Sequence, residues 1–227
     1  SDGSNGGLAS NYTISAGQTT TANVTGKALT VSGITASNKT YDGNTNAPLD
    51  ISSISYTGLV SGDDIGGLFS GTFDNKNIGT GKTVTISASY SGVDSGNYSV
   101  TDQSSTTANI TARTLTVSGL TASNKTYDAT TSATLDTSNV SYAGLVSGDS
   151  FSGSYTGAFN NSNVGTSKLV TISSSYSGDD INNYSITDQS STGADITKAS
   201  PTISGFSAQS KYSDENYNLA GVPSISG

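Results

Sequence analysis

Apolar residues alternate with threonine and serine along many short stretches of the chain. In 83–87, Val84 and Ile86 fall on one side of an extended segment while the threonines fall on the other, which is the pattern of a half-buried strand. Gly, Asn and Asp interrupt such stretches at close intervals, as turns require. The pattern predicts short strands at 29–31, 55–56, 71–73, 83–87, 88–90, 98–101 and 108–111.

The strands expected at 98–101 and 108–111 flank the turn 102–105, and this arrangement predicts a closing hairpin. Strands spaced about 8–12 residues apart favour an immunoglobulin-like β-sandwich. The sequence Asp-Ser-Gly-Asn-Tyr at 94–98 is also similar to the tyrosine corner of that fold, in which a Tyr hydroxyl bonds to nearby backbone. We therefore expect an all-β fold of small sandwich modules.

The alternative is a β-grasp module with a short helix near 61–69. Ser61 or Asp63 is placed to cap such a helix. Gly66 and Gly67 oppose it, because glycine costs roughly 1 kcal/mol relative to alanine inside a helix.

The strand pattern repeats with a period of 86 residues. Leu-Thr-Val-Ser-Gly at 29–33 returns at 115–119, and laying 28–113 over 114–199 needs no gap and leaves roughly 55 of the 86 pairs identical. Solenoid repeats are shorter, at about 20–50 residues, so the period indicates a string of small domains. We predict the tail of a preceding module at 1–27, complete modules at 28–113 and 114–199, and the start of a third at 200–227.

Composition removes several classes of function. The chain has no cysteine, histidine, methionine or tryptophan, so it lacks the ligands of an ordinary zinc site and the partners of a Ser–His or Cys–His nucleophile. Paired carboxylates for glycoside hydrolysis are the remaining enzymatic option, yet the sole glutamate is Glu215 and no acid pair has a cluster of aromatics. We expect no enzymatic activity and no cofactor.

Charge and hydropathy bear on partners. The formal net charge is −8 and the nine Lys and Arg residues form no basic cluster, which argues against nucleic-acid binding. No apolar run approaches the roughly 20 residues of a membrane-spanning helix, so we expect no membrane insertion of this segment.

Several spaced motifs resemble those of one family. Lys-Thr-Tyr-Asp-Gly at 39–43, Gly-Leu-Val-Ser-Gly-Asp at 58–63, Asn-Ile-Gly-Thr-Gly-Lys at 77–82 and Asn-Tyr at 97–98 resemble the YDG modules of large secreted bacterial adhesins. The second module departs at Ala129, which replaces Gly43. The segment 200–227 resembles the related MBG type.

The resemblance implies a setting as well as a fold. Such modules form stalks in filamentous-haemagglutinin-like proteins, often exported by two-partner secretion, that act in adhesion, aggregation and biofilm formation. The implied location is secreted or at the bacterial cell surface. The family pattern has no catalytic residues, so none is implied here.

Tyr41-Asp42 and Tyr127-Asp128 are the candidate ligand contacts, since Tyr offers a sugar an apolar face with a polar tip. The alternative is that the tyrosine packs in the core or at a module junction while the aspartate caps a turn.

Two weaker candidates use recurring polar residues. Oxygen ligands for Ca²⁺ are available at Asp63, Asp64 and Asp149, although Ser150 replaces the second member of the pair. A Lys–Asn crosslink would draw on the residues that recur in both modules, which are Lys39, Lys82 and Asn97 with their counterparts Lys125, Lys168 and Asn183.

The passage from one module to the next at 110–115 contains no Gly/Ser spacer. This predicts a semi-rigid rod in which each module contacts its neighbours. Two functions remain open: a spacer that projects a distal head, or an array whose units bind glycan or exopolysaccharide weakly and gain affinity by avidity.

Overall fold

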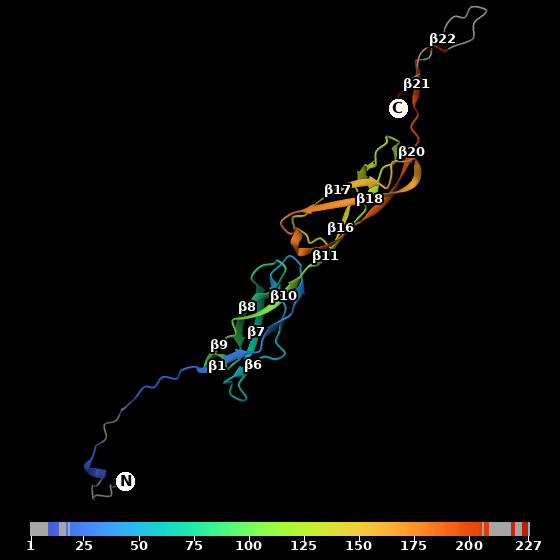
Figure 1. Ribbon diagram of the computed structural model, residues 1–227. Coiled ribbons are helices and arrows are strands. Elements are labelled where there is room, and N and C mark those ends of the chain that lie inside the picture. The colour runs from blue at the N-terminus through green and yellow to red at the C-terminus, as the bar shows by residue number, and fades with distance from the viewer. Residues whose placement is uncertain are drawn as a thin grey trace, which may run out of the picture.

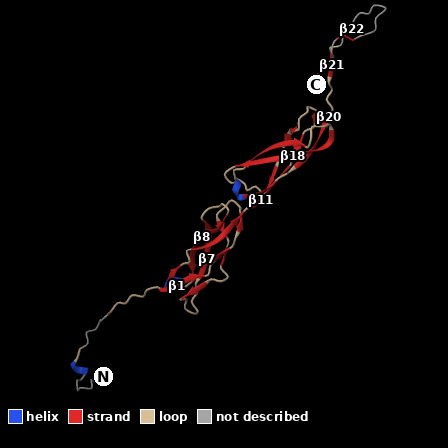
Figure 2. Cartoon of the chain, in the orientation of Figure 1, coloured by secondary structure: helices blue, strands red, loops and turns tan. Residues whose placement is uncertain are grey.

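The computed structural model describes residues 9–13, 17, 19–205, 207–208, 219–220 and 224–226. Two modules built from strands lie end to end in an elongated chain (Figure 1), and strands and loops make up almost all of both (Figure 2). The predicted all-β tandem architecture is confirmed. Among the described residues no helix has the length and apolar character needed to cross a membrane.

Each module has the same order of elements. The first contains β1 (Lys27–Ser32), β2 (Thr35–Ala36), β3 (Lys39–Thr40), β4 (Asn46–Ala47), β5 (Leu49–Asp50), β6 (Ser55–Thr57), β7 (Gly66–Phe73), β8 (Gly79–Ser91), the 3₁₀ turn η2 (Ser95–Asn97), β9 (Tyr98–Thr101) and β10 (Ser105–Thr111). The second contains β11 (Arg113–Ser118), β12 (Thr121–Ala122), β13 (Lys125–Thr126), β14 (Ser132–Ala133), β15 (Leu135–Asp136), β16 (Ser141–Ala143), β17 (Ser152–Phe159), β18 (Gly165–Ser177), η3 (Ile181–Asn183), β19 (Tyr184–Thr187) and β20 (Ser191–Thr197).

The strands of the first module form a three-stranded sheet of order β6-β1-β9 and a five-stranded sheet of order β3-β10-β8-β7-β4, with β2 and β5 as a separate pair. The second module repeats this arrangement. Two pairs in each module are parallel, β1 with β9 and β3 with β10 in the first. An immunoglobulin sandwich consists of antiparallel sheets, so these parallel pairs set the topology apart from the expected one.

Alternation along the longest strand places the core between the two sheets. In β8, Val84 and Ile86 are buried while Thr85 between them is exposed. Ile86 packs with Val31 of β1, and the partly buried Tyr56 and Val100 of β6 and β9 cover the same cluster. Val117, Leu120 and Ile172 form the matching cluster in the second module. Each fully buried aliphatic side chain contributes roughly 1.5–3 kcal/mol, so these small clusters help to stabilise both modules.

The helix considered for 61–69 is wrong. Gly66 begins the eight-residue strand β7, which pairs with β8 along its whole length, from Gly66 opposite Ser91 to Phe73 opposite Val84. Glycine suits the second position of this strand, because a Cβ on Gly67 would lie 2.6 Å from the Phe69 ring. Packing within the sheet therefore decides the local conformation.

The closing hairpin is also wrong, because β9 belongs to the three-stranded sheet and β10 to the five-stranded one. Gln103 holds the crossing between them: its Oε1 accepts from the Ile34 amide at 3.0 Å and its Nε2 donates to the Ile34 carbonyl at 2.6 Å. Gln189 repeats both bonds with Leu120.

The tyrosine corner has a different partner from the one expected. The Tyr98 hydroxyl accepts from the Val60 amide, 38 residues earlier in the chain, at 3.0 Å. It therefore ties the strand to a distant loop rather than to nearby backbone.

The predicted end segments lie partly outside the described residues. Within 1–27, the described parts include η1 (Ala9–Asn11) and an exposed stretch without regular secondary structure at 19–26. Of the MBG-like segment, the described parts are 200–205 and the short strands β21 (Thr202–Ser204), β22 (Ser207–Ala208), β23 (Leu219–Ala220) and β24 (Ser224–Ser226), while 206, 209–218, 221–223 and 227 lie outside.

Candidate functional site: the junction between the modules

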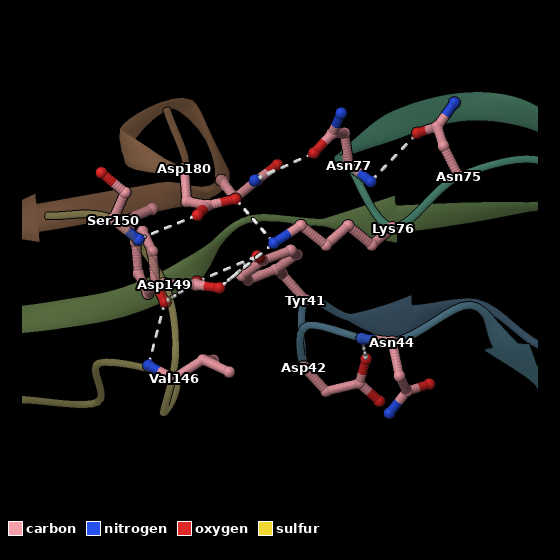
Figure 3. A network of polar contacts seen from close by, with 12 residues as sticks. Tyr41, Asp42, Asn44, Asn75, Lys76, Asn77, Val146, Asp149, Ser150 and Asp180 are labelled. Atoms are coloured by element: carbon pink, nitrogen blue, oxygen red, sulfur yellow. Dashed lines mark hydrogen bonds and ion pairs between the residues drawn. The ribbon is translucent and has the colours of Figure 1, made fainter. Parts of the chain in front are cut away.

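The two modules meet where loops at one end of the first module contact loops at the adjoining end of the second (Figure 3). The C-terminal face of the first module consists of Tyr41, Gly43, Lys76, Asn77 and Ile78. The N-terminal face of the second module consists of Val146, Asp149, Asp180, Asn183 and Tyr184. The residues of both faces come from loops, a 3₁₀ turn or strand ends, and the sheets hold these segments in place.

Tyr41 is the anchor of the junction. It follows β3 directly, its amide donates to the Thr111 carbonyl at 2.9 Å, and its side chain is fully buried. The ring packs edge-on against the Tyr184 ring with centroids 5.6 Å apart. The hydroxyl donates to Asp149, 2.9 Å from Oδ2 and 3.1 Å from Oδ1.

Asp149 is a carboxylate enclosed by groups from both modules. Its side chain is only 3% exposed and lies 3.3 Å from the Lys76 ammonium. Besides the Tyr41 hydroxyl it accepts from the Tyr184 hydroxyl at 2.5 Å. A buried charge is costly unless it is paired and hydrogen-bonded, so Asp149 depends on the first module for part of its compensation.

Lys76 reaches across the junction from the loop between β7 and β8. Its ammonium lies 2.7 Å from Asp180 Oδ1 and 5.9 Å from the centre of the Tyr41 ring. The hydrogen bond from Lys76, followed by one from the Ser150 amide, lowers the pKa of Asp180. The same pairing raises the pKa of Lys76, so both groups are charged across the ordinary pH range.

The two tyrosines are held in the neutral form. Burial and then the hydrogen bond to Asp149 raise the pKa of Tyr184 to about 12. The pKa of Tyr41 is raised by the same two causes in the same order. Both hydroxyls therefore remain donors to Asp149 at neutral pH.

Asn183 pairs with backbone and side chain of the other module. It is 2% exposed. Its Oδ1 accepts from the Ile78 amide at 3.0 Å, and its Nδ2 donates to Asn77 Oδ1 at 3.2 Å. These bonds satisfy a buried amide through the first module, whereas the matching Asn97 of the first module is exposed.

The covalent connection is short and its surroundings are packed. Only Ala112 separates β10 from β11. Arg113 Nε donates to the Gly144 carbonyl at 2.6 Å, and the buried Leu115 joins Tyr41, Val84 and Tyr184 in one apolar cluster that spans both modules. A continuous core across a one-residue linker fixes the relative orientation of the modules.

Gly43 is required by both its backbone and its neighbour. Its φ is +81°, and a Cβ at this position would lie 2.8 Å from Val146 Cγ1. In the second module Ala129 takes the matching place with φ 62°. Ala129 keeps the positive φ of this position and lines the surface hollow beside Tyr127.

The structure separates the predicted ligand contacts. Tyr41 is buried in the junction, while Asp42 turns to solvent, accepts from the Asn44 amide at 3.2 Å and pairs with Lys39 at 2.8 Å. Tyr127 and Asp128 instead line one surface hollow of about 800 Å³. Asp128 pairs with Lys125 at 2.8 Å, and this hydrogen bond is the main reason that its pKa is lowered to about 2.

The residues considered for calcium serve internal contacts. Asp63 accepts from the Tyr98 hydroxyl at 2.5 Å, and the Asp64 amide donates to Asp94 at 2.8 Å. Asp149 lies at the junction. Across the described residues no three acidic side chains gather as a metal site would require.

The lysines considered for a crosslink bind other residues in each module. Lys82 pairs with Asp74 at 2.7 Å and Lys168 binds Asn161 at 2.7 Å. Asn97 is exposed and Asn183 lies in the junction.

Sequence reasoning missed Lys76 and Asp180. One signal was available for Lys76, since Ser162 replaces it in a repeat that keeps most of its polar residues. The difference marks a position whose environment changes from one module to the next.

These observations define a class of protein, a tandem array of all-β modules joined by packed junctions. The family model that matches is the YDG domain, over residues 25–108 and again over 111–193. The chain belongs to the YDG domain family. No curated protein and no solved structure matches the chain significantly.

Proposed function

We propose that this chain is a structural stalk of a secreted or cell-surface bacterial adhesin, which projects a distal binding domain in cell adhesion, aggregation or biofilm formation. The observation that carries the proposal is the junction, where a one-residue linker and a shared core set two modules end to end (Figure 1). A spacer needs this property because each freely jointed link would shorten the reach of the array.

Surface chemistry supports the same role. Exposed Thr, Ser and Asn hydrate the strands, and the net charge of −8 keeps neighbouring chains apart. The carboxylates of the junction bind two tyrosines and a lysine, and these contacts between the modules explain the arrangement of the acidic side chains. We therefore propose no catalytic role for them.

The test uses the parent protein in its own bacterium. Residues 28–199 are deleted in frame, and adhesion or aggregation is measured beside the binding of the released head. We expect adhesion to fall while head binding is unchanged, and an unrelated rigid spacer of equal length to restore adhesion. Adhesion that stays normal after the deletion would contradict the proposal.

The second candidate function is weak glycan binding by the modules themselves. The observation in its favour is the hollow beside Tyr127, whose ring is 42% exposed. Titration of the chain with a glycan panel tests it. Binding that is lost in Tyr127→Ala and retained in Tyr41→Ala would favour this candidate, as would failure of the unrelated spacer to restore adhesion.

A further inference from the structure

The first module carries its own copy of the N-terminal face, at Val60, Asp63, Asp94, Asn97 and Tyr98. Each lies 86 positions before its counterpart in the second module. Their internal contacts match closely. The Val60 amide donates to the Tyr98 hydroxyl at 3.0 Å, against 2.9 Å for Val146 and Tyr184.

The carboxylates of this copy are held in the same way. The Tyr98 hydroxyl donates to Asp63 Oδ2 at 2.5 Å, as Tyr184 does to Asp149. The Asp64 amide donates to Asp94 Oδ2 at 2.8 Å, as the Ser150 amide does to Asp180 at 3.0 Å. The face is therefore assembled in the first module although, among the residues that the structure describes, no other module packs on it.

The two copies differ in exposure. Val60 is 43% exposed and Asn97 is exposed, while Asn183 and Tyr184 in the second module are 2% and 8% exposed. Within the described residues no lysine or arginine pairs with Asp63 or Asp94, whereas Lys76 pairs with both Asp149 and Asp180. In the described part of the chain, a buried tyrosine and a lysine cover the second copy, and neither covers the first.

We propose that the N-terminal face of the first module is a docking site for the C-terminal face of another YDG module, one that carries a tyrosine and a lysine at the positions of Tyr41 and Lys76. The established junction supplies the argument, since the same residues in the same internal geometry bind that pair there. Charge complementarity selects the partner: two carboxylates on the face require a cation opposite them.

The lysine makes the site selective among modules. The second module keeps Tyr127 but has Ser162 in place of Lys76 and Ala129 in place of Gly43. Its C-terminal face therefore has no lysine at the place of Lys76, and Lys198, at the place of Ala112, lines the hollow beside Tyr127 instead. This face also carries an extra methyl group at the place where Gly43 meets Val146. A module of the first type fits the proposed docking site and a module of the second type does not, so the order of modules along an array is specified by these positions.

The experiment builds the missing junction within the chain. Residues 27–111 are duplicated in front of Gly26, in place of 1–25, so that the added copy is followed by Gly26 where the natural junction has Ala112. Amide hydrogen exchange is then followed for peptides covering 58–64 and 93–98. We expect exchange there to slow at least tenfold relative to the unmodified chain, approaching that of 144–150 and 179–184. Unchanged exchange overturns the proposal.

Two variants of the duplicated chain sharpen the test. Replacing the added copy's lysine by serine, as at Ser162, is expected to remove most of the new protection. Asp94→Asn in the docking site is expected to do the same while leaving protection at 144–150 intact. If the serine variant keeps full protection, the selectivity for lysine is wrong.

This inference deepens the proposed stalk function, and the two fail separately. If the docking site fills in the duplicated chain but deletion of 28–199 leaves adhesion normal, only the adhesin role falls. If adhesion depends on 28–199 but the docking site stays open to exchange, only the docking site falls.

Discussion

Tyr41 and Asp149 lie 108 positions apart in the chain and are joined by a hydrogen bond of 2.9 Å. The bond crosses from one module to the next, and both side chains are almost completely buried. A single tyrosine thus links the end of one core to the start of another. The consequence is that the stability of the two modules is coupled.

Tyr41→Phe keeps the ring but removes the hydroxyl, which leaves Asp149 one donor short. Hydrogen bonds to charged groups contribute about 1.5–3 kcal/mol, so we expect the free energy of unfolding in urea to fall by about that much. Tyr127→Phe is the matched control, because Tyr127 is 42% exposed and its hydroxyl has solvent available. Equal effects of the two variants would contradict the coupling.

Asn183→Ala is expected to destabilise the chain by about 1–3 kcal/mol, because it removes a buried side-chain amide and leaves the Ile78 amide without its acceptor. Asn97→Ala alters the same position of the repeat on an exposed surface and should change the free energy of unfolding by less than about 0.5 kcal/mol. Urea unfolding of both variants provides the comparison. A loss of similar size in Asn97→Ala would show that the residue matters within a module rather than between modules.

Gly43→Ala is expected to cost about 1–3 kcal/mol, since alanine is disfavoured at φ +81° and its methyl group would meet Val146. Thermal unfolding measures the loss. The double variant Gly43→Ala with Val146→Ala should recover part of it, because the second change removes the methyl group in the way. Absence of any recovery would assign the whole cost to the backbone.

The junction should respond to alkali. The pKa of Tyr184 is raised to about 12 from an ordinary value of 10.0, so the folded state holds this proton more tightly than the unfolded state. The resulting stabilisation is complete below about pH 10 and is lost as pH rises toward about 12. Tyrosinate absorbance and urea unfolding across this range provide the measurement. Tyr184→Phe should show a smaller alkaline loss, and titration of Tyr184 near its ordinary value would contradict the expectation.

The acid side has the opposite sign. The pKa of Asp180 is lowered from 3.8, mainly by Lys76, so its contribution is complete above about pH 4 and is lost as pH falls through its folded value. Asp180→Asn should therefore flatten the acid limb of the stability curve. Other carboxylates with a lowered pKa set the remaining slope of stability against pH, and Asp128, which pairs with Lys125, is one of them.

The amino-acid sequence by itself determined the repeat, several of the strands and the inward faces of those strands. A period of 86 is visible because residues recur at fixed positions, and Val84 and Ile86 face the core because side chains alternate along any strand. These are local properties, so a local pattern reports them. The passage at 110–115, which has no Gly/Ser spacer, likewise predicted a semi-rigid connection between the modules.

Tertiary structure alone decided which strands pair and which repeated residues are buried. β9 and β10 lie near each other in sequence but in different sheets, because partners distant along the chain, β1 and β8, compete for their edges. Asn97 and Asn183 occupy the same place in the repeat, yet one is exposed and the other buried. Burial at the end of a module depends on what its neighbour brings there, and Lys76 and Tyr41 come from the other side of the junction.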